Sequence, residues 1–71
     1  MNAVLEKQIY KVQEGKRWAE IEFVKGRFAK CVYQVSSKVS YNLDDWKFLG
    51  ELAQEIQRLA LSYETGREKD G

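Results

Sequence analysis

The first half of the chain alternates apolar and polar residues in three runs that glycines separate. These runs cover about residues 5–13, residues 17–24 and residues 28–35. Alternation with a period of two is typical of strands that bury one face. Gly15 and Gly26 predict tight turns between the runs, because glycine adopts positive φ without steric cost. We therefore expect an antiparallel β-meander.

The alternation also predicts which side chains share a face of the sheet. In the second strand an apolar face opposes a face with a Trp and charged residues: Ala19, Ile21 and Phe23 against Trp18, Glu20, Glu22 and Val24. In the third strand, the alternation puts Phe28 and Lys30 on the face that matches Trp18. A brief fourth strand is expected over residues 38–42, after a short connection.

Beyond residue 43 the period of the pattern changes from two to between three and four. The apolar positions with this spacing are Trp46, Leu49, Leu52, Ala53, Ile56, Leu59, Ala60 and Tyr63. Such spacing predicts one face of an amphipathic helix. Asn42 or Asp44 can cap it, and Asp44 and Asp45 suit the positive end of the helix dipole. We expect one ββββα domain over residues 1–63, of the α+β class, and a flexible polar tail over residues 64–71.

The expected helix carries more apolar surface than one sheet face can cover. Phe48 and Leu61 widen the stripe, and Gly50 inside the helix indicates close approach by another backbone. A chain of 71 residues buries only about 60% of its unfolded surface. With one Cys and no His, an internal disulfide is impossible and a structural zinc site is nearly excluded. We therefore expect a homodimer with an interface formed by Trp46, Leu49, Leu52, Ile56 and Leu59.

The sequence contains no recognisable catalytic constellation. Without His the usual general base is missing, and Ser/His/Asp or Cys/His schemes are excluded. The glycines lie too far apart for a phosphate-cradling loop. The lone Cys31 shares its strand face with small and apolar neighbours, which predicts a buried, inert thiol. We expect no enzymatic activity, no cofactor and no metal.

Charge is distributed unevenly along the chain, although the formal net charge is only +1. Residues 16–38 hold six Lys or Arg and two Glu, whereas residues 39–63 hold four acids and two cations. A basic sheet suggests a polyanionic partner, but such clusters also occur on ordinary soluble surfaces. Aromatic residues among the cations suit single-stranded nucleic acid, whose bases stack on rings. The alternative is that Trp18 and Phe28 form a cross-strand pair that stabilises the hairpin.

Two stretches resemble the family of the eukaryotic transcriptional coactivator positive cofactor four. Residues 17–27, RWAEIEFVKGR, are similar to an Arg-aromatic strand that leads into a Lys-Gly-Lys hairpin. Residues 38–46, KVSYNLDDW, resemble the short last strand and the acidic N-cap of a helix with Trp in its first turn. The resemblance covers about residues 9–62. It implies a curved four-stranded sheet, one C-terminal helix, dimers formed through the helices, and single-stranded DNA binding in transcription, replication or repair.

Carried over by position, the resemblance implies that Arg17, Lys25 and Arg27 contact phosphate. The expected nucleic-acid-binding residues are Arg17, Trp18, Lys25, Arg27, Phe28, Lys30 and Lys38. The chain departs from the family at Glu20 and Glu22, which add negative charge to the second strand. We expect a homodimer that binds single-stranded DNA or RNA. The alternative is a small protein-interaction module that binds a partner protein through its sheet or helix.

The sequence also carries an expectation about location. Residues 1–7 lack the basic region and apolar run of a signal peptide, and no window approaches 18 consecutive apolar residues. A lone Cys fits a reducing compartment. These features predict a cytoplasmic, nucleoid-associated or nuclear protein without a membrane partner.

Overall fold

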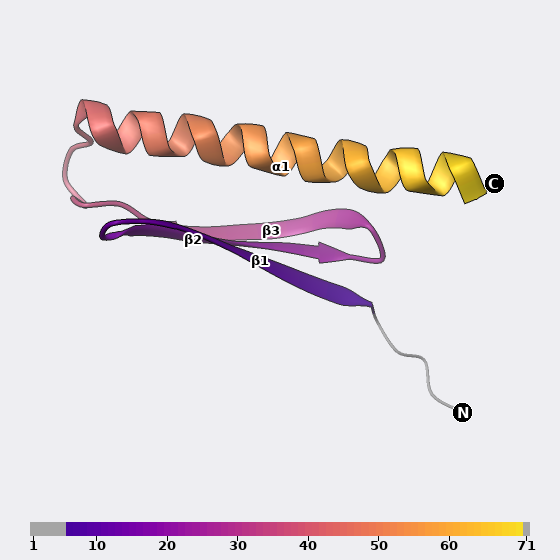
Figure 1. The fold of residues 1–71 in the computed structure, drawn as a ribbon. Helices are drawn as coiled ribbons and strands as arrows, with labels where there is room; N and C mark the ends of the chain where they lie inside the picture. Colours follow the sequence, from indigo (N-terminus) through magenta and orange to yellow (C-terminus); the bar gives the residue numbers. More distant parts are fainter. Residues whose placement is uncertain (1–5, 71) are drawn as a thin grey trace.

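Each alternating run forms one strand, and the run with helical spacing forms one helix. The computed structural model describes residues 6–70, with side chains for residues 6–65. The elements are β1 (Lys7–Glu14), β2 (Arg17–Val24), β3 (Arg27–Gln34) and α1 (Leu43–Asp70). The strands form one antiparallel sheet in the order β1-β2-β3, and α1 runs along one face of it (Figure 1). The expected α+β class is confirmed.

Both turns of the meander depend on backbone with positive φ. Gly15 has a φ of 62° in the turn between β1 and β2. Lys25 and Gly26, with φ of 54° and 76°, form the two-residue turn between β2 and β3. Two consecutive positive φ angles are the mark of a type I′ turn, whose twist matches that of the flanking strands. The backbone amide of Lys25 donates to the carbonyl oxygen of Glu6 at 2.8 Å, which extends the β1 pairing by one residue.

The core lies between α1 and the sheet face that packs against it, here called the inner face. The buried residues come mostly from β2 and α1, and they are Ala19, Ile21, Phe23, Val35, Phe48, Leu52 and Leu59. Each large apolar side chain that is buried in this way contributes roughly 1.5–3 kcal/mol. Phe48, which the spacing placed beyond the apolar stripe, is only 1% exposed and faces the sheet. The helix is therefore rotated towards Phe48 relative to the predicted face.

Aromatic rings close the core at the end near the C-terminal half of the helix. The ring of Phe23 packs edge-on against Tyr10 and lies 5.0 Å, centroid to centroid, from the ring of Tyr63. The hydroxyls of Tyr10 and Tyr63 form a hydrogen bond, which together with burial raises the pKa of Tyr63 to about 12. Strand β1 is thus connected directly to α1 at Tyr63, about two turns before the end of the helix. The helix continues to Asp70, well past the boundary expected at Tyr63.

The predicted fourth strand is wrong, since residues 35–42 form no strand in the structure. The side chain of Ser37 accepts hydrogen bonds from the backbone amides of Val39 at 3.2 Å and Ser40 at 3.4 Å. These bonds fold the segment back on itself in place of a ladder, which is how Ser side chains compete with regular structure. The segment then ends at Asn42, which caps the helix. The described sheet accordingly has three strands rather than four.

A β-bulge changes the face that one predicted site residue occupies. Glu22 lies opposite Lys30, but the next residue, Phe23, lies opposite Phe28, so Ala29 is the extra residue in β3. The bulge moves Phe28 to the inner face, where its ring packs edge-on against Phe23 at 6.0 Å. The expected pairing of Trp18 with Phe28 is therefore wrong. Cys31 stays on the inner face but is only half-buried, and burial raises the pKa of its thiol.

Candidate nucleic-acid interface

The outer face of the sheet, opposite α1, is the surface that collects the most cations. The pairing register places Lys7 and Lys11 of β1 there, together with Arg27 and Lys30 of β3. Lys25 lies in the turn at one end of the same face. All five side chains are exposed to solvent. The sheet therefore assembles five cations from three separate stretches of sequence.

One end of the outer face, here called the basic end, carries four of these cations. Lys7, Val24 and Arg27 lie in one cross-strand row, and Lys25 lies in the turn directly beyond it. Lys30 follows in the next row towards the middle of the sheet. No ion pair is formed by these four cations within the described side chains. Such a cluster is the electrostatic footprint expected of a polyanion site.

The opposite end of the outer face carries Trp18. Its register partners are Gln13 on β1 and Gln34 on β3, so the indole is flanked by two neutral amides. Trp18 is half-buried, and no ring contact covers it among the described side chains. Trp18 lies six positions along β2 from Val24, which pairs with Arg27, a span of about 20 Å. The outer face thus has a basic end and an aromatic end.

Two carboxylates lie between these ends, as the sequence predicted. Glu20 lies opposite Lys11, and Glu22 lies opposite Lys30. Opposite charges in directly paired positions favour each other, so each carboxylate is partly balanced by the neighbouring strand. The lysines also hold positive charge on both sides of the carboxylates. A phosphate backbone that crosses this face would run along β1 or β3 rather than along the central strand.

Arg17 does not belong to the outer face. Its register position beside Glu14 puts it on the inner side, where its Nε donates to Oδ1 of Asp45 at 2.8 Å. The two side chains are 18% and 0% exposed, respectively. The charge of Arg17 is thus already neutralised within the chain. This arginine ties the first turn of α1 to the start of β2.

Asp45 is the centre of a buried polar network at the start of the helix. Its Oδ1 accepts hydrogen bonds from Arg17 and from both the backbone amide and hydroxyl of Ser36, at 3.3 and 2.8 Å. Its Oδ2 accepts from the amide of Asn42 at 2.9 Å, while Asn42 Oδ1 accepts from the amide of Asp45 at 2.8 Å. This reciprocal pair is a capping box with Asn42 as the N-cap. Burial opposes the charged form, but the hydrogen bonds from Arg17, Asn42 and Ser36 outweigh it and hold the pKa of Asp45 well below its ordinary value.

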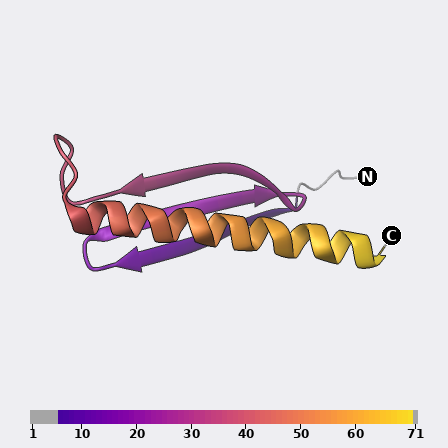
Figure 2. The ribbon, with the colours of Figure 1, turned by 90° about the horizontal axis from the view of Figure 1, so that it is seen from above.

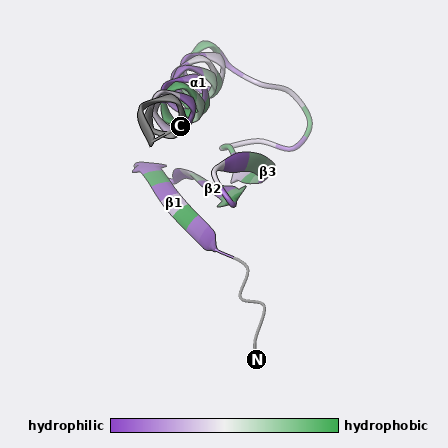
Figure 3. Cartoon of the chain, turned by 90° about the vertical axis from the view of Figure 1, so that its right-hand side faces the viewer, coloured by the Kyte–Doolittle hydropathy of each residue, from purple (hydrophilic) through white to green (hydrophobic). Residues whose placement is uncertain are grey.

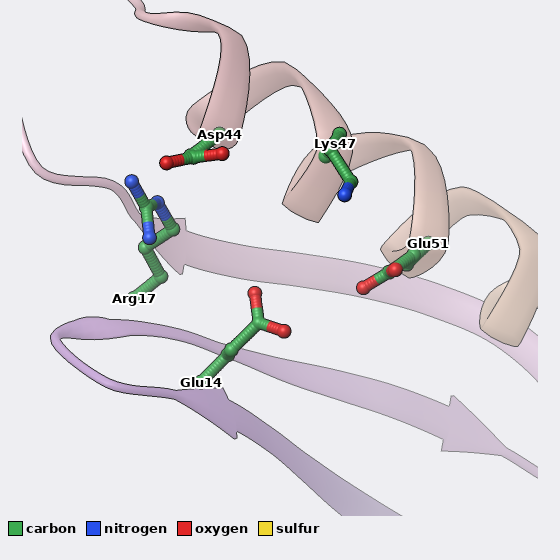
Figure 4. A pocket seen from close by; sticks show the side chains of 5 residues that line it. All are labelled: Glu14, Arg17, Asp44, Lys47 and Glu51. Atoms are coloured by element: carbon green, nitrogen blue, oxygen red, sulfur yellow. The ribbon is translucent and has the colours of Figure 1, made fainter.

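A charged hollow of 290 Å³ lies beside this network (Figure 4). It is lined by Glu14, Arg17, Asp44, Lys47 and Glu51. The mixture of three carboxylates with two cations does not suit a polyanion. The lining also shows how α1 is oriented. Its residues Lys47 and Glu51 lie on the same hollow as Glu14 of β1. The flank of the helix with Lys47 and Glu51 therefore lies on the β1 side.

The opposite flank of α1 is apolar and incompletely covered. Trp46 is 58% exposed and packs edge-on against Tyr41 at 5.0 Å, and Ala53 is also exposed. On the inner face of β3, Phe28 and Tyr33 remain 48% and 45% exposed. Figures 2 and 3 show that β3 passes to one side of the helix axis, although the two elements are in contact. We call Phe28, Trp46 and Ala53 the open strip, whereas Tyr33 lines a separate hollow with Tyr41.

The predicted dimer-interface residues divide between the core and the edge of the open strip. Leu52 and Leu59 are 5% and 7% exposed and pack on the chain's own sheet, which corrects their assignment to contact with a second copy. Leu49 and Ile56 are half-buried beside the core, next to the open strip. Trp46 is the one member of the predicted set that is mostly exposed, at 58%. Among the described residues of the chain, no backbone approaches Gly50, since a Cβ there would meet nothing within 4 Å.

Two outer-face residues were missed by the sequence analysis. Lys7 and Lys11 alternate with the same period as the rest of β1, and that period could have placed them together with Ile9 on one face. Their relation to β3 depends on the pairing register, which the sequence alone does not provide. Lys38, by contrast, is not part of a strand and lies exposed in the loop after β3.

Comparisons with known proteins identify no relative of this chain. No protein-family model matches it, no curated protein matches it, and no solved structure matches it. Within residues 6–70, the single helix is not apolar enough over a sufficient length to cross a membrane. The functional interpretation therefore depends on the geometry of the chain's own residues.

Proposed function

We propose that this chain binds single-stranded nucleic acid across the outer face of its sheet, as a homodimer. One observation carries the proposal. The register collects Lys7, Lys11, Lys25, Arg27 and Lys30 on the side of the sheet that also presents Trp18 and is opposite the helix. Cations track a phosphate backbone, and an exposed indole face stacks on a base.

The expected binding mode tolerates any sequence and either sugar. Stacking needs only the π-face that every base has, and phosphate contacts carry no sequence information. The span of about 20 Å between Trp18 and Arg27 suits a short stretch of extended strand. The resemblance of residues 17–27 to the hairpin motif of positive cofactor four supports the same surface. Arg17 is left out of the contact set, since it is occupied by Asp45.

A mobility-shift titration with a labelled thirty-base single strand tests the proposal. At low salt and micromolar protein we expect a shifted complex. The logarithm of the affinity should fall linearly with the logarithm of salt concentration, by about 0.7 for each phosphate neutralised. Absence of binding under these conditions would rule the proposal out.

A matched pair of variants locates the surface. Lys30→Gln removes one cation from the outer face, whereas Lys47→Gln removes one from α1 on the other side of the sheet. We expect Lys30→Gln to reduce the salt slope by about 0.7 and Lys47→Gln to leave it unchanged. Trp18→Ala should instead cost about 1–3 kcal/mol of binding at an unchanged slope. Equal effects of the two lysine variants would contradict an outer-face site.

The homodimer is supported by the open strip. Large apolar side chains remain exposed on both β3 and α1, and exposed apolar groups of this kind favour an interaction site on a chain this small. Light scattering should give twice the 8.3 kDa of one chain. Ala53→Asp places a charge in the strip without disturbing the core, and we expect it to give monomers. Gln54→Asp, one residue further on an exposed position, is the control and should remain dimeric.

The second candidate function is a module that binds a different protein. The observation that favours it is again the open strip, with Trp46 at 58% exposure. If the wild-type chain is monomeric and binds no single strand, this strip is the surface that a partner protein would cover. The scattering and mobility-shift experiments together therefore decide between the two functions.

A further inference from the structure

A second hollow, also of 290 Å³, lies where β3 passes into the loop that leads to α1. It is lined by Tyr33, Gln34, Val35, Ser37, Lys38 and Tyr41. Its volume falls just below the range for small-ligand pockets, about 300–1,000 Å³, so it suits a group smaller than a whole ligand. The lining combines two aromatic rings, an amide, a hydroxyl and one cation. These are the groups that recognise an unpaired base and its phosphate.

Packing holds the ring of Tyr41, and Tyr33 lies beside it in the hollow. Tyr41 packs edge-on against Trp46 at 5.0 Å, and the Tyr33 hydroxyl hydrogen-bonds to that of Tyr41. This hydrogen bond, followed by burial, raises the pKa of Tyr41. Tyr33 lies opposite Ala19, which has no ring to cover it, and remains 45% exposed. Tyr33 therefore offers an aromatic surface within a fixed frame.

The polar groups of the hollow retain hydrogen-bonding capacity. Ser37 Oγ accepts from the amides of Val39 and Ser40, so its hydroxyl proton is still available for donation. The exposed amide of Gln34 can both donate and accept. Lys38 adds an exposed ammonium group at the rim. A base edge needs this combination of a donor and an acceptor beside a stacking surface.

The hollow adjoins the aromatic end of the outer face. Gln34 lines the hollow and is also the register partner of Trp18. Neighbouring strands lie about 4.8 Å apart, so a strand that passes Trp18 reaches the hollow by crossing β3 alone. Because Tyr33 lies on the inner face, a bound strand would pass from Trp18 around the edge strand β3 to reach the hollow.

We propose that this hollow binds one unpaired nucleobase of the strand on the outer face, with the base against Tyr33 and its phosphate beside Lys38. This inference rests on the proposed function, and it adds a defined base site to a surface that otherwise contacts only backbone and Trp18. It also gives Lys38 and Tyr41 a joint role. Gln34 and Ser37 line the same hollow and offer donors and acceptors to the edge of any base.

Abasic single strands test the inference without altering the protein. A twelve-base strand is prepared with one abasic position, moved stepwise along the strand, and its affinity is measured by fluorescence anisotropy. We expect one position besides that of Trp18 where loss of the base weakens binding by about tenfold. Tyr33→Ser should lower the affinity for the intact strand by a similar factor. In this variant, removing the base at that position should have no further effect on the affinity. Circular dichroism confirms that the variant is folded.

The outcomes separate this inference from the proposed function. If no single strand binds the wild-type chain, both fail. In a second outcome, single strands bind, Trp18→Ala lowers their affinity, Tyr33→Ser does not, and only one abasic position lowers the affinity. The outer-face function then holds and the base site is overturned. If Lys38→Gln also reduces the salt slope by about 0.7, while Lys47→Gln does not, the phosphate contact is supported.

Discussion

Arg17 and Arg27 begin adjacent strands and look equivalent in the sequence, but they lie on opposite faces of the sheet. Arg17 is on the inner side, 18% exposed, with its Nε bonded to the buried carboxylate of Asp45. Arg27 lies on the outer face in a row with Lys7, and it is exposed. One arginine holds the fold together, and the other is available to a ligand. The face that a cation occupies, rather than its place in a motif, therefore decides its role.

The largest expected effect comes from removing the partner of the inner arginine. Asp45→Ala leaves Arg17 without its counter-ion and deletes the helix capping box at the same time. We expect the melting temperature to fall by about 15 °C or more. Thermal unfolding followed by circular dichroism measures it. A shift of less than about 3 °C would show that the network contributes little.

The second-largest expected effect is the loss of thermal stability at low pH. Hydrogen bonds hold the pKa of Asp45 below the ordinary value of about 3.9, so the unfolded chain takes up this proton first as the pH falls. The stabilisation is fully present above about pH 5 and is lost progressively as the pH falls below about 4. The melting temperature of the wild type should therefore fall more steeply between pH 5 and pH 2 than that of Asp45→Asn. Parallel curves for the two proteins would contradict this account.

The comparison is tested directly by making the same change at each arginine. Arg17→Gln should lower the melting temperature by about 10 °C. At temperatures where the variant is folded, the salt slope of single-strand binding should be unchanged. Arg27→Gln should change the melting temperature by less than about 4 °C and reduce the slope by about 0.7. If both variants reduce the slope, Arg17 reaches the ligand in spite of its bond to Asp45.

The sequence predicted the elements of this fold better than it predicted the site. Periods of two and of three to four residues located the three strands and the helix, because burial of one face imposes them. The position of Phe28 was not predictable, since a one-residue bulge at Ala29 reverses the face of everything before it. The Arg17–Asp45 pair joins residues 28 positions apart, and no local pattern marks it. Site assignments thus failed where they depended on register or on long-range contact.

The smallest expected effect sharpens the description of the outer face itself. Glu22 lies between Ile9 and Lys30, close to the path proposed for the phosphate backbone. Glu22→Lys exchanges a repulsive charge for an attractive one, and we expect binding to tighten by about tenfold or less at low salt, with a slope steeper by about 0.7. Glu51→Lys makes the same exchange on α1, beside the charged hollow. Because Glu51 and Glu22 change the net charge equally, a general electrostatic effect would tighten binding in both variants. Tightening in Glu22→Lys alone would place the bound strand on the face that carries Arg27 and not on the face that carries Arg17.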